Sequence, residues 1–238
     1  MEGLDIARSG TTLVATVERG EQNSFSGEMI DAFADAIDEA GDDGSTVFVR
    51  LRTRGGVFIL ARDREGTTPD ELRAEGARIV RINETLRRSP LISIAEVNGD
   101  AAGFGVGIVA ASDIAVASSE ATFRFPEITY GLAPTVVISW ATKVLPQKRA
   151  FDMAVTGEPI DAGTAERIGL ITEAAPPDRV EARVDERIAA MERWSASALR
   201  EIKRFFVHVR GMDPASAAAS SVDPLVLASL RMRASSTS

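Results

Sequence analysis

The sequence predicts an α/β fold whose strands and helices alternate before a helical C-terminal region. Short runs rich in Val, Ile and other apolar residues recur between amphipathic segments as far as about residue 175, a pattern typical of alternating strands and helices. Pro176-Pro177 marks a boundary, and the 238-residue chain then continues with helical patterning. We therefore expect a core over residues 1–176 and a helical region over residues 177–238.

The predicted strands of the core are short apolar runs bounded by turn residues. They cover residues 12–17, 47–51, 57–60, 91–97 and 113–117. Glu96 interrupts one of these buried strands, so we expect an arginine partner for it. Ser26 is the expected N-cap of the first helix, and Pro69 opens a longer helix that stops before Pro90. A glycine-rich turn begins an apolar helix over about 103–111.

The C-terminal region is expected to consist of helices over residues 178–191, 196–210 and 214–230. An Ala/Ser-rich stretch at 215–221 and the tail at 234–238 have the composition of weakly packed or disordered segments. A region of about 60 residues is too small for a core of its own. We therefore expect it to pack on the core or on another subunit.

The composition excludes several kinds of chemistry. The chain has no cysteine and one histidine, His208, which rules out a thiolate nucleophile and a multi-histidine centre, and we expect no metal site. His208 lies on a predicted helix, where a lone histidine is usually structural. The formal net charge is −8 and there is no basic stripe, which argues against a nucleic-acid partner. With no signal region and no apolar run long enough for a bilayer, we expect a cytoplasmic protein without a membrane partner.

Gly103, Gly105 and Gly107 form a Gly-x-Gly-x-Gly pattern between a predicted buried strand and a helix. Unpaired N–H groups at a helix start attract negative oxygen, which fits a phosphate or a developing oxyanion. The spacing differs from the dinucleotide-binding pattern, and no suitable acid follows the next strand. The alternative is that the glycines simply let this helix pack closely, and the motif alone does not decide between the two.

Three longer segments together resemble the crotonase superfamily, also called the enoyl-CoA hydratase/isomerase superfamily. They are AEVNGDAAGFG at 95–105, SDIAVASSEATFRFPEITYGLAP at 112–134 and VTGEPIDAGTAERIGLI at 155–171. In order and spacing the likeness runs from about Thr12 to Lys203. It implies a spiral of ββα units with C-terminal helices that form trimers, often paired into hexamers. It also implies an acyl-CoA substrate, with coenzyme A as the carrier of the acyl group and no further cofactor.

In this superfamily two backbone N–H groups stabilise the enolate oxygen that the thioester develops during the reaction. The resemblance assigns these donors to Arg62 and Phe104, and preorganised donors of this kind contribute several kcal/mol. Both residues depart from the usual pattern, which has a small residue at the first position and glycine at the second. Their side chains are expected to intrude on the acyl pocket or to reshape the loop.

The resemblance leaves one carboxylate for proton transfer. Hydratases of the superfamily use two glutamates, and here Gly107 stands at one of these positions and Glu127 at the other. Isomerases work with the carboxylate at the Glu127 position alone, which moves a proton between two carbons. An apolar setting is expected to raise the pKa of Glu127. The alternative is an ordinary glutamate at a helix start or on the surface.

Further positions are expected at the substrate site. They are Asp63, Asp100, Gly103, Gly107, Tyr130, Pro134 and Lys203. For Asp63 a structural role is the favoured alternative, whereas the resemblance places Lys203 near the phosphates of coenzyme A. Arg62, Arg64 and Arg124 could hold a substrate carboxylate, although such arginines are usually solvated.

These observations favour an isomerase that shuttles a proton through Glu127 while the Arg62 and Phe104 N–H groups hold the enolate. The alternative is a hydratase, a C–C bond hydrolase or a decarboxylase of the same superfamily, with the missing acid supplied elsewhere. A third interpretation is a member that has lost catalysis and serves as a binding or assembly subunit. An acyl-CoA is the expected small-molecule partner, and we expect a homotrimer or a homohexamer.

Overall fold

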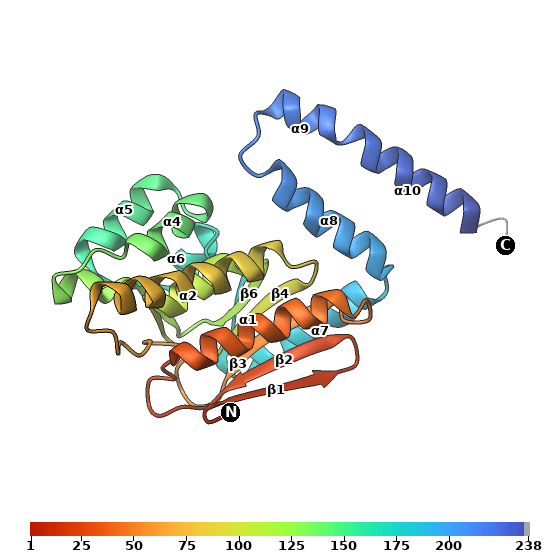
Figure 1. Ribbon diagram of the computed structural model, residues 1–238. Coiled ribbons are helices and arrows are strands. Elements are labelled where there is room, and N and C mark those ends of the chain that lie inside the picture. The colour runs from red at the N-terminus through yellow and green to blue at the C-terminus, as the bar shows by residue number, and fades with distance from the viewer. Residues whose placement is uncertain (236–238) are drawn as a thin grey trace.

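The computed structural model describes residues 1–235, and its main element is a mixed sheet with helices on both faces (Figure 1). In spatial order the strands are β1 (Leu4–Ser9), β2 (Thr12–Val17), β3 (Phe48–Thr53), β4 (Ile92–Val97), β6 (Ile114–Ser118) and β9 (Glu173–Ala175). β1 runs antiparallel to β2, and the later neighbours pair in parallel. The predicted α/β class is confirmed.

A second, small sheet contacts the helix that follows the glycine-rich turn. Its strands, in spatial order, are β5 (Ala101–Ala102), β7 (Thr122–Arg124) and β8 (Ile160–Asp161). The sequence gives no sign of β1 in the main sheet, because Asp5 and Arg8 interrupt its apolar residues. Such charges are common on an edge strand, where one side of the backbone faces solvent.

The prediction of a strand at 57–60 is wrong. The segment forms only an isolated β-bridge, between Val57 and Asp100. The N–H of Phe58 donates to the carbonyl oxygen of Asp100 (2.9 Å), and the N–H of Ala102 donates to that of Ile59 (2.9 Å). The segment therefore docks as a loop against the turn that follows β4. Its apolar side chains are buried there, which explains why its composition is that of a strand.

The helices of the body are α1 (Gly27–Asp42), α2 (Pro69–Arg88), α3 (Phe104–Ala111), α4 (Thr135–Val144), α5 (Gln147–Thr156) and α6 (Ala162–Arg167), with a 3-10 turn, η1, at Pro126–Tyr130. Three of these helices, α1, α2 and α6, begin at residues whose side chains cap them. The N–H of Met29 donates to the side chain of Ser26 at 3.2 Å. Thr68 and Glu71 form a reciprocal capping box around Pro69, which satisfies N–H groups that a helix start leaves free. The predicted starts of α1 and α2 are confirmed.

Strands β3 and β4 are buried on both faces because helices cover each side of the sheet (Figure 1). Along β4, Ala95 faces the core beneath α1, α2 and α3, whereas Ile94 faces α7 (Val180–Glu192). Glu96 shares the second face, and the Nε of Arg50 donates to its carboxylate at 2.6 Å. The expected arginine partner of Glu96 is confirmed.

The C-terminal region starts with the 3-10 turn η2 (Pro177–Arg179) and α7, followed by α8 (Ala196–Val209), α9 (Pro214–Ser220) and α10 (Val222–Ser235). α7 packs on β4 and β6, and α8 reaches the body through Leu199, whereas α9 and α10 extend away from it (Figure 1). The helix expected at 214–230 is broken at Ser221. Pro224 explains the break, since proline fits the first turn of a new helix and not the interior of a continuous one.

The Ala/Ser-rich stretch forms α9, in which none of the described residues is buried. Of the tail expected to be disordered, residues 234–235 end α10 and residues 236–238 lie outside the described part of the chain. α10 carries exposed apolar side chains at Leu225, Val226, Leu227, Leu230 and Met232. Within residues 1–235, no helix is both long enough and apolar enough to cross a membrane.

Candidate active site

A pocket of about 530 Å³ opens beside the N-terminus of α3. Its walls come from the loop after β3, from α2, from the first turn of α3, from η1 and from α4. Segments that follow neighbouring parallel strands meet at one edge of a sheet, so β3 and β4 bring the loop and the α3 turn together. The residues from the sequence prediction that line the pocket are Arg62, Arg64, Gly103, Phe104, Arg124, Glu127, Tyr130 and Pro134.

The N–H of Arg62 is left unpaired by the way its loop docks. The N–H of Phe25 donates to the carbonyl oxygen of Ala61 (3.3 Å), and the N–H of Asp63 donates to that of Phe25 (2.8 Å). In a parallel bridge alternate residues turn their N–H groups to the neighbour. The N–H of Arg62 therefore faces away from Phe25, and it has no acceptor within residues 1–235.

The N–H of Phe104 is also free, because Phe104 is the first residue of α3. The first N–H groups of a helix have no partner within it. Here the N–H of Gly107 is the one that donates to the carbonyl oxygen of Gly103, at 3.0 Å. That of Phe104 meets no acceptor in the described part of the chain, so both assigned donors are available to a ligand oxygen.

The two loops that carry these amides are held against each other by main-chain contacts. The N–H of Ala102 donates to the carbonyl oxygen of Ile59. A Cβ atom added to Gly105 would overlap the same Ile59 oxygen, and one added to Gly99 would overlap the carbonyl oxygen of Gly56. Glycine at these two positions therefore lets the backbones approach closely enough to fix the two amides in one unit.

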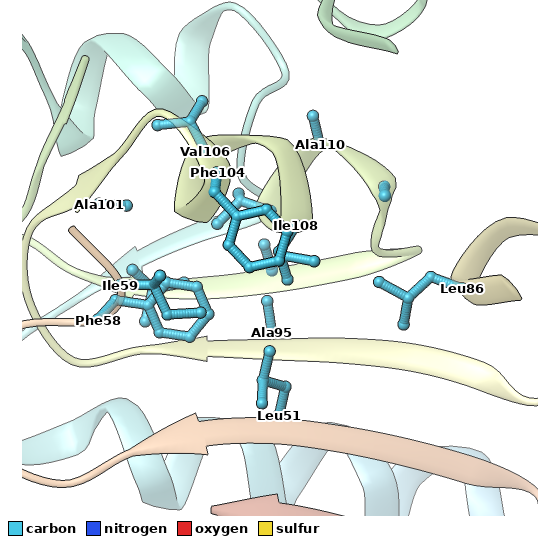
Figure 2. Close-up of a cluster of buried hydrophobic side chains, with 14 of the residues drawn as sticks. Leu51, Phe58, Ile59, Leu86, Ala95, Ala101, Phe104, Val106, Ile108 and Ala110 are labelled. Carbon is cyan, nitrogen blue, oxygen red and sulfur yellow. The ribbon is translucent and has the colours of Figure 1, made fainter. Parts of the chain in front are cut away.

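The side chains of Arg62 and Phe104 each have a partner within the protein. Phe104 is buried, with its ring centroid 5.5 Å from that of Phe25, and Figure 2 shows its ring turned from α3 towards Ala95 of the sheet. The guanidinium of Arg62 pairs with the carboxylate of Glu75 on α2, at 3.1 Å. Both residues still belong to the pocket wall, so the expected effect of their side chains on the acyl pocket stays a prediction.

Glu127 lies on η1, which follows the fully buried Phe125. Its Oε2 atom is buried and finds no hydrogen-bond partner within residues 1–235. Burial raises the pKa of Glu127 above its ordinary value, while the positive charges of Arg64 and Arg62 oppose that shift. The result is a carboxyl group that binds a proton more readily than a solvated glutamate.

Gly103 sits directly under this carboxylate. A Cβ atom at Gly103 would lie 2.6 Å from the Oε1 of Glu127, and the residue has a φ of +50°. The positive φ is strained for a residue with a side chain, and a Cβ atom would also require the flexible Glu127 side chain to move. Glycine as the last residue before α3 thus leaves space for the Glu127 carboxylate.

Gly107 does not line the pocket, contrary to the expectation that it contacts substrate. It is buried one turn into α3, and a Cβ atom there would lie 3.4 Å from the Cγ1 of Val137 on α4. Val137 itself lines the pocket. The space beside the position of the second hydratase acid is therefore filled by a valine side chain.

Asp63 and Asp100 also lie outside the pocket lining, and each has a structural partner. The carboxylate of Asp63 pairs with Arg19 at 2.7 Å, in agreement with the structural alternative. That of Asp100 accepts from the N–H of Thr122 at 2.7 Å and so joins the turn after β4 to β7. The expected substrate contacts of both aspartates are corrected to roles in loop structure.

Lys203 lies in a buried contact between α8 and the body. Its Nζ donates to the carbonyl oxygens of Leu86 (2.7 Å) and Leu91 (2.6 Å) and to the carboxylate of Asp113 (2.6 Å). Burial lowers the pKa of Lys203, and Asp113 opposes this. A lysine with three acceptors and a buried side chain is a structural residue, which corrects the expected contact with coenzyme A.

Glu75 is a site residue that the sequence did not single out. Besides pairing with Arg62, its carboxylate accepts from the N–H groups of Glu65 (2.8 Å) and Gly66 (2.5 Å). Glu75 thereby fixes the loop that carries the first free amide. On a helix rich in charged residues, a glutamate at this position looks like one more solvated side chain, so the sequence held no signal for it.

The chain is similar to known proteins along most of its length. The family model for enoyl-CoA hydratase/isomerase matches residues 8–231. The enoyl-CoA hydratase domain-containing protein 3, mitochondrial, of Mus musculus is 31% identical over 183 residues, which cover 72% of this chain and 60% of the mouse protein. A trans-2-decenoyl-[acyl-carrier-protein] isomerase of Streptococcus mutans is 26% identical over 201 residues, which cover 79% of this chain and 75% of that protein.

The fold is shared with solved structures as well. A crystal structure of an enoyl-CoA hydratase from Mycobacterium smegmatis superposes with a TM-score of 0.91 at 25% identity, over 94% of this chain and 90% of that one. This chain spans 60% of the length of the mouse relative, so the likeness describes a shared domain. With a family match over nearly the whole chain and the same fold, the protein belongs to the enoyl-CoA hydratase/isomerase family, the crotonase superfamily.

Proposed function

We propose that this chain acts on acyl thioesters and moves a carbon–carbon double bond by transferring a proton through Glu127. The observation that carries the proposal is the position of this carboxylate, over Gly103 in a pocket that also contains Arg62 and Phe104. A half-buried carboxylate with a raised pKa is suited to take a proton from carbon and to give it back. Membership of the enoyl-CoA hydratase/isomerase family supports the reaction class.

In the proposed reaction the thioester carbonyl oxygen of a 3-enoyl group accepts hydrogen bonds from the N–H groups of Arg62 and Phe104. Glu127 removes a proton from C2, and the electron pair moves onto that oxygen to form a dienolate, which the two donors stabilise. The protonated Glu127 then delivers the proton to C4. The double bond shifts to C2–C3, and the Glu127 carboxylate is restored for the next cycle.

The remaining pocket wall suits an acyl chain. Its apolar side chains come from α2, the segment after η1 and α4, and they are Leu72, Ile79, Leu132, Val136 and Val137. Burial of methylene groups against such side chains contributes about 0.8 kcal/mol for each group. We propose coenzyme A as the carrier of the acyl group, without a further cofactor, while the trimer or hexamer and the cytoplasmic location stay predictions.

An isomerase is favoured over a hydratase because glycine stands at position 107, where hydratases of the family have their second acid. Adding water across a double bond requires a second group to position the water, and Val137 occupies the space beside Gly107 where the hydratase glutamate is expected. One of the curated relatives is named as an isomerase of a 2-decenoyl thioester, which supports the same choice. Proton transfer between two carbons needs only the carboxylate that this chain retains.

The test replaces Glu127 with glutamine and measures isomerisation of 3-hexenoyl-CoA. Loss of a general base of this kind lowers turnover by about 100- to 10,000-fold, so Glu127→Gln should be inactive at that level. Glu120→Gln, an exposed glutamate outside the pocket, is the matched control and should keep full activity. A Glu127→Gln variant with the rate of the unchanged protein would refute the proposed proton transfer.

A further inference from the structure

Two arginines line the active-site pocket without a carboxylate partner. Arg64 and Arg124 both belong to the pocket wall and are exposed. Within residues 1–235, neither side chain forms an ion pair or a hydrogen bond, whereas Arg62 in the same wall is committed to Glu75. A chain with a formal net charge of −8 thus places two unpaired positive charges at its reaction site.

The backbone directs Arg124 towards the pocket. Side chains alternate between the two faces of a strand, and Phe123 and Phe125 on either side of Arg124 are fully buried. Arg124 therefore projects from the opposite face, where the pocket lies. Its own carbonyl oxygen accepts from the N–H of Gly103 at 3.0 Å, so its backbone is tied to the residue beneath the Glu127 carboxylate.

Arg64 lies close in the chain to the free N–H group of Arg62. It follows the free amide of Arg62 by two residues, and the next residues of this loop are held by the Glu75 carboxylate. Burial raises the pKa of Glu127, and the charge of Arg64 opposes that rise, which places Arg64 within electrostatic reach of the base. The two arginines thus line the same pocket as the Arg62 and Phe104 amides and the Glu127 carboxylate.

We propose that the acyl group of the substrate carries a second carboxylate, which Arg64 and Arg124 bind. The inference rests on the proposed function, because the thioester carbonyl is taken to lie at the Arg62 and Phe104 amides. A guanidinium group matches a carboxylate through two parallel N–H···O bonds. The two unpaired guanidinium groups would supply those bonds and balance the added negative charge beside Glu127.

A phosphate of the carrier is the other anion with this chemistry, and position argues against it. Both arginines adjoin residues of the reacting centre, within a few residues of Arg62 and of Glu127. In coenzyme A the phosphates lie at the far end of the pantetheine arm from the thioester. An anion held between Arg64 and Arg124 is therefore expected to belong to the acyl group.

The first experiment measures binding by calorimetry, with saturated thioesters that have no double bond to move. Hexanedioyl-CoA and hexanoyl-CoA have acyl chains of equal length and differ in a terminal carboxylate. Hydrogen bonds between charged groups correspond to about 10- to 100-fold in affinity, so we expect hexanedioyl-CoA to bind at least about tenfold more tightly. Arg64→Gln and Arg124→Gln should each reduce that preference, and the double variant should abolish it.

The controls separate the acyl carboxylate from the carrier. Arg149→Gln changes an exposed arginine outside the pocket and should leave the preference intact. The same two acyl groups on pantetheine, which lacks phosphate, should show the same preference. Equal affinities for the two acyl groups would overturn the proposal. So would arginine variants that weaken both coenzyme A thioesters alike and leave the pantetheine thioesters unaffected, because that result assigns the arginines to a phosphate.

Turnover separates this inference from the proposed function. The measured reaction is isomerisation of 3-hexenedioyl-CoA against 3-hexenoyl-CoA. If Glu127→Gln stops both reactions but the dicarboxylic thioester is not preferred, the isomerase proposal stands and the carboxylate inference fails. If the dicarboxylic thioester binds preferentially but Glu127→Gln still isomerises it at full rate, the anion site stands and the proton shuttle fails.

Discussion

At the scale of single residues, the proton affinity of Glu127 is set by two opposing influences. Burial disfavours the charged carboxylate and raises its pKa, while a hydrogen bond from its own backbone N–H and the charges of Arg64 and Arg62 favour the charge and lower the pKa. Because the folded state binds this proton more tightly than the unfolded chain, the free energy of unfolding falls as the pH rises through the pKa. Glu127→Gln is therefore expected to be at least as stable as the original protein at neutral pH.

The same balance predicts a pH profile. Glu127 must be ionised to accept a proton, so kcat/KM should rise with pH and level off above a pKa higher than that of an ordinary glutamate. Arg64→Gln removes one positive charge and should move this acidic limb to still higher pH. Arg149→Gln should leave the limb in place. A limb that stays in place in Arg64→Gln, or moves to lower pH, would contradict the electrostatic role of Arg64.

At the scale of elements, the contact between α3 and α4 decides which acids reach the pocket. A Cβ atom added to Gly107 on α3 would lie 3.4 and 3.6 Å from the two γ carbons of Val137 on α4. A glutamate at 107 would have to pass this valine to enter the pocket. Glycine at 107 thus packs opposite valine at 137. We expect that a second acid in the pocket needs substitutions at both positions.

This packing predicts how hydration of a 2-enoyl thioester should respond to substitution. Gly107→Glu alone should bury its carboxylate against Val137, lower the free energy of unfolding by about 1 to 3 kcal/mol and add no water to crotonyl-CoA. Gly107→Glu combined with Val137→Ala should open a path to the pocket and give measurable hydration. The Val137→Ala variant is the control for the cavity alone. Hydration by the Gly107→Glu single variant would show that Val137 is no obstacle.

At the scale of the whole molecule, the C-terminal helices are attached to the body at a few points. α7 covers the second face of the sheet, and α8 is joined through Leu199 and through the buried ammonium group of Lys203. Lys203 links α8 to the end of α2, to the residue before β4 and to the residue before β6. α9 and α10 extend beyond this attachment with their apolar side chains exposed (Figure 1).

Lys203→Met should therefore destabilise the protein as a whole. The substitution removes the ammonium partner of two carbonyl oxygens and of the Asp113 carboxylate, which keeps its hydrogen bonds from Ser93. Removing one side of a buried ion pair costs about 3 kcal/mol. Urea denaturation should show this loss, together with looser attachment of α8 in hydrogen exchange. Lys148→Met, on the exposed surface of α5, should change stability by less than about 0.5 kcal/mol. A similar small effect at Lys203 would refute the attachment.

Local chemistry explains which parts were predictable from the sequence. Ser26, Thr68 and Pro69 act within one turn of the chain, so their caps identify the starts of α1 and α2 without knowledge of the fold. The segment at 57–60 has the composition of a strand, but its backbone partners are distant in sequence: Asp100 and Ala102 in the turn after β4, and Gln22 before α1. Whether such a run extends a sheet or docks as a loop is decided by tertiary contacts.

The candidate site also has residues that the sequence could identify and residues that it could not. Glu127 and the glycine turn stand in contiguous segments, so resemblance found them, and the structure brings them together at one pocket. The Glu75 carboxylate, on α2, contacts the Arg62 side chain and the N–H groups of Glu65 and Gly66. The Lys203 ammonium group donates to three acceptors in different parts of the body. Neither role leaves a pattern along the chain, because each depends on which surfaces face one another after folding.

The close approach of the two loops at Gly99 and Gly105 has a practical meaning for other chains of this family. The spacing of the proposed donors depends on main-chain contact, so the side chains at Arg62 and Phe104 can be exchanged for others while the amides keep their places. A bulkier residue at either glycine would instead push the loops apart. In an unfamiliar sequence, these two glycines are therefore a better diagnostic of an intact donor pair than the residues that carry the donors.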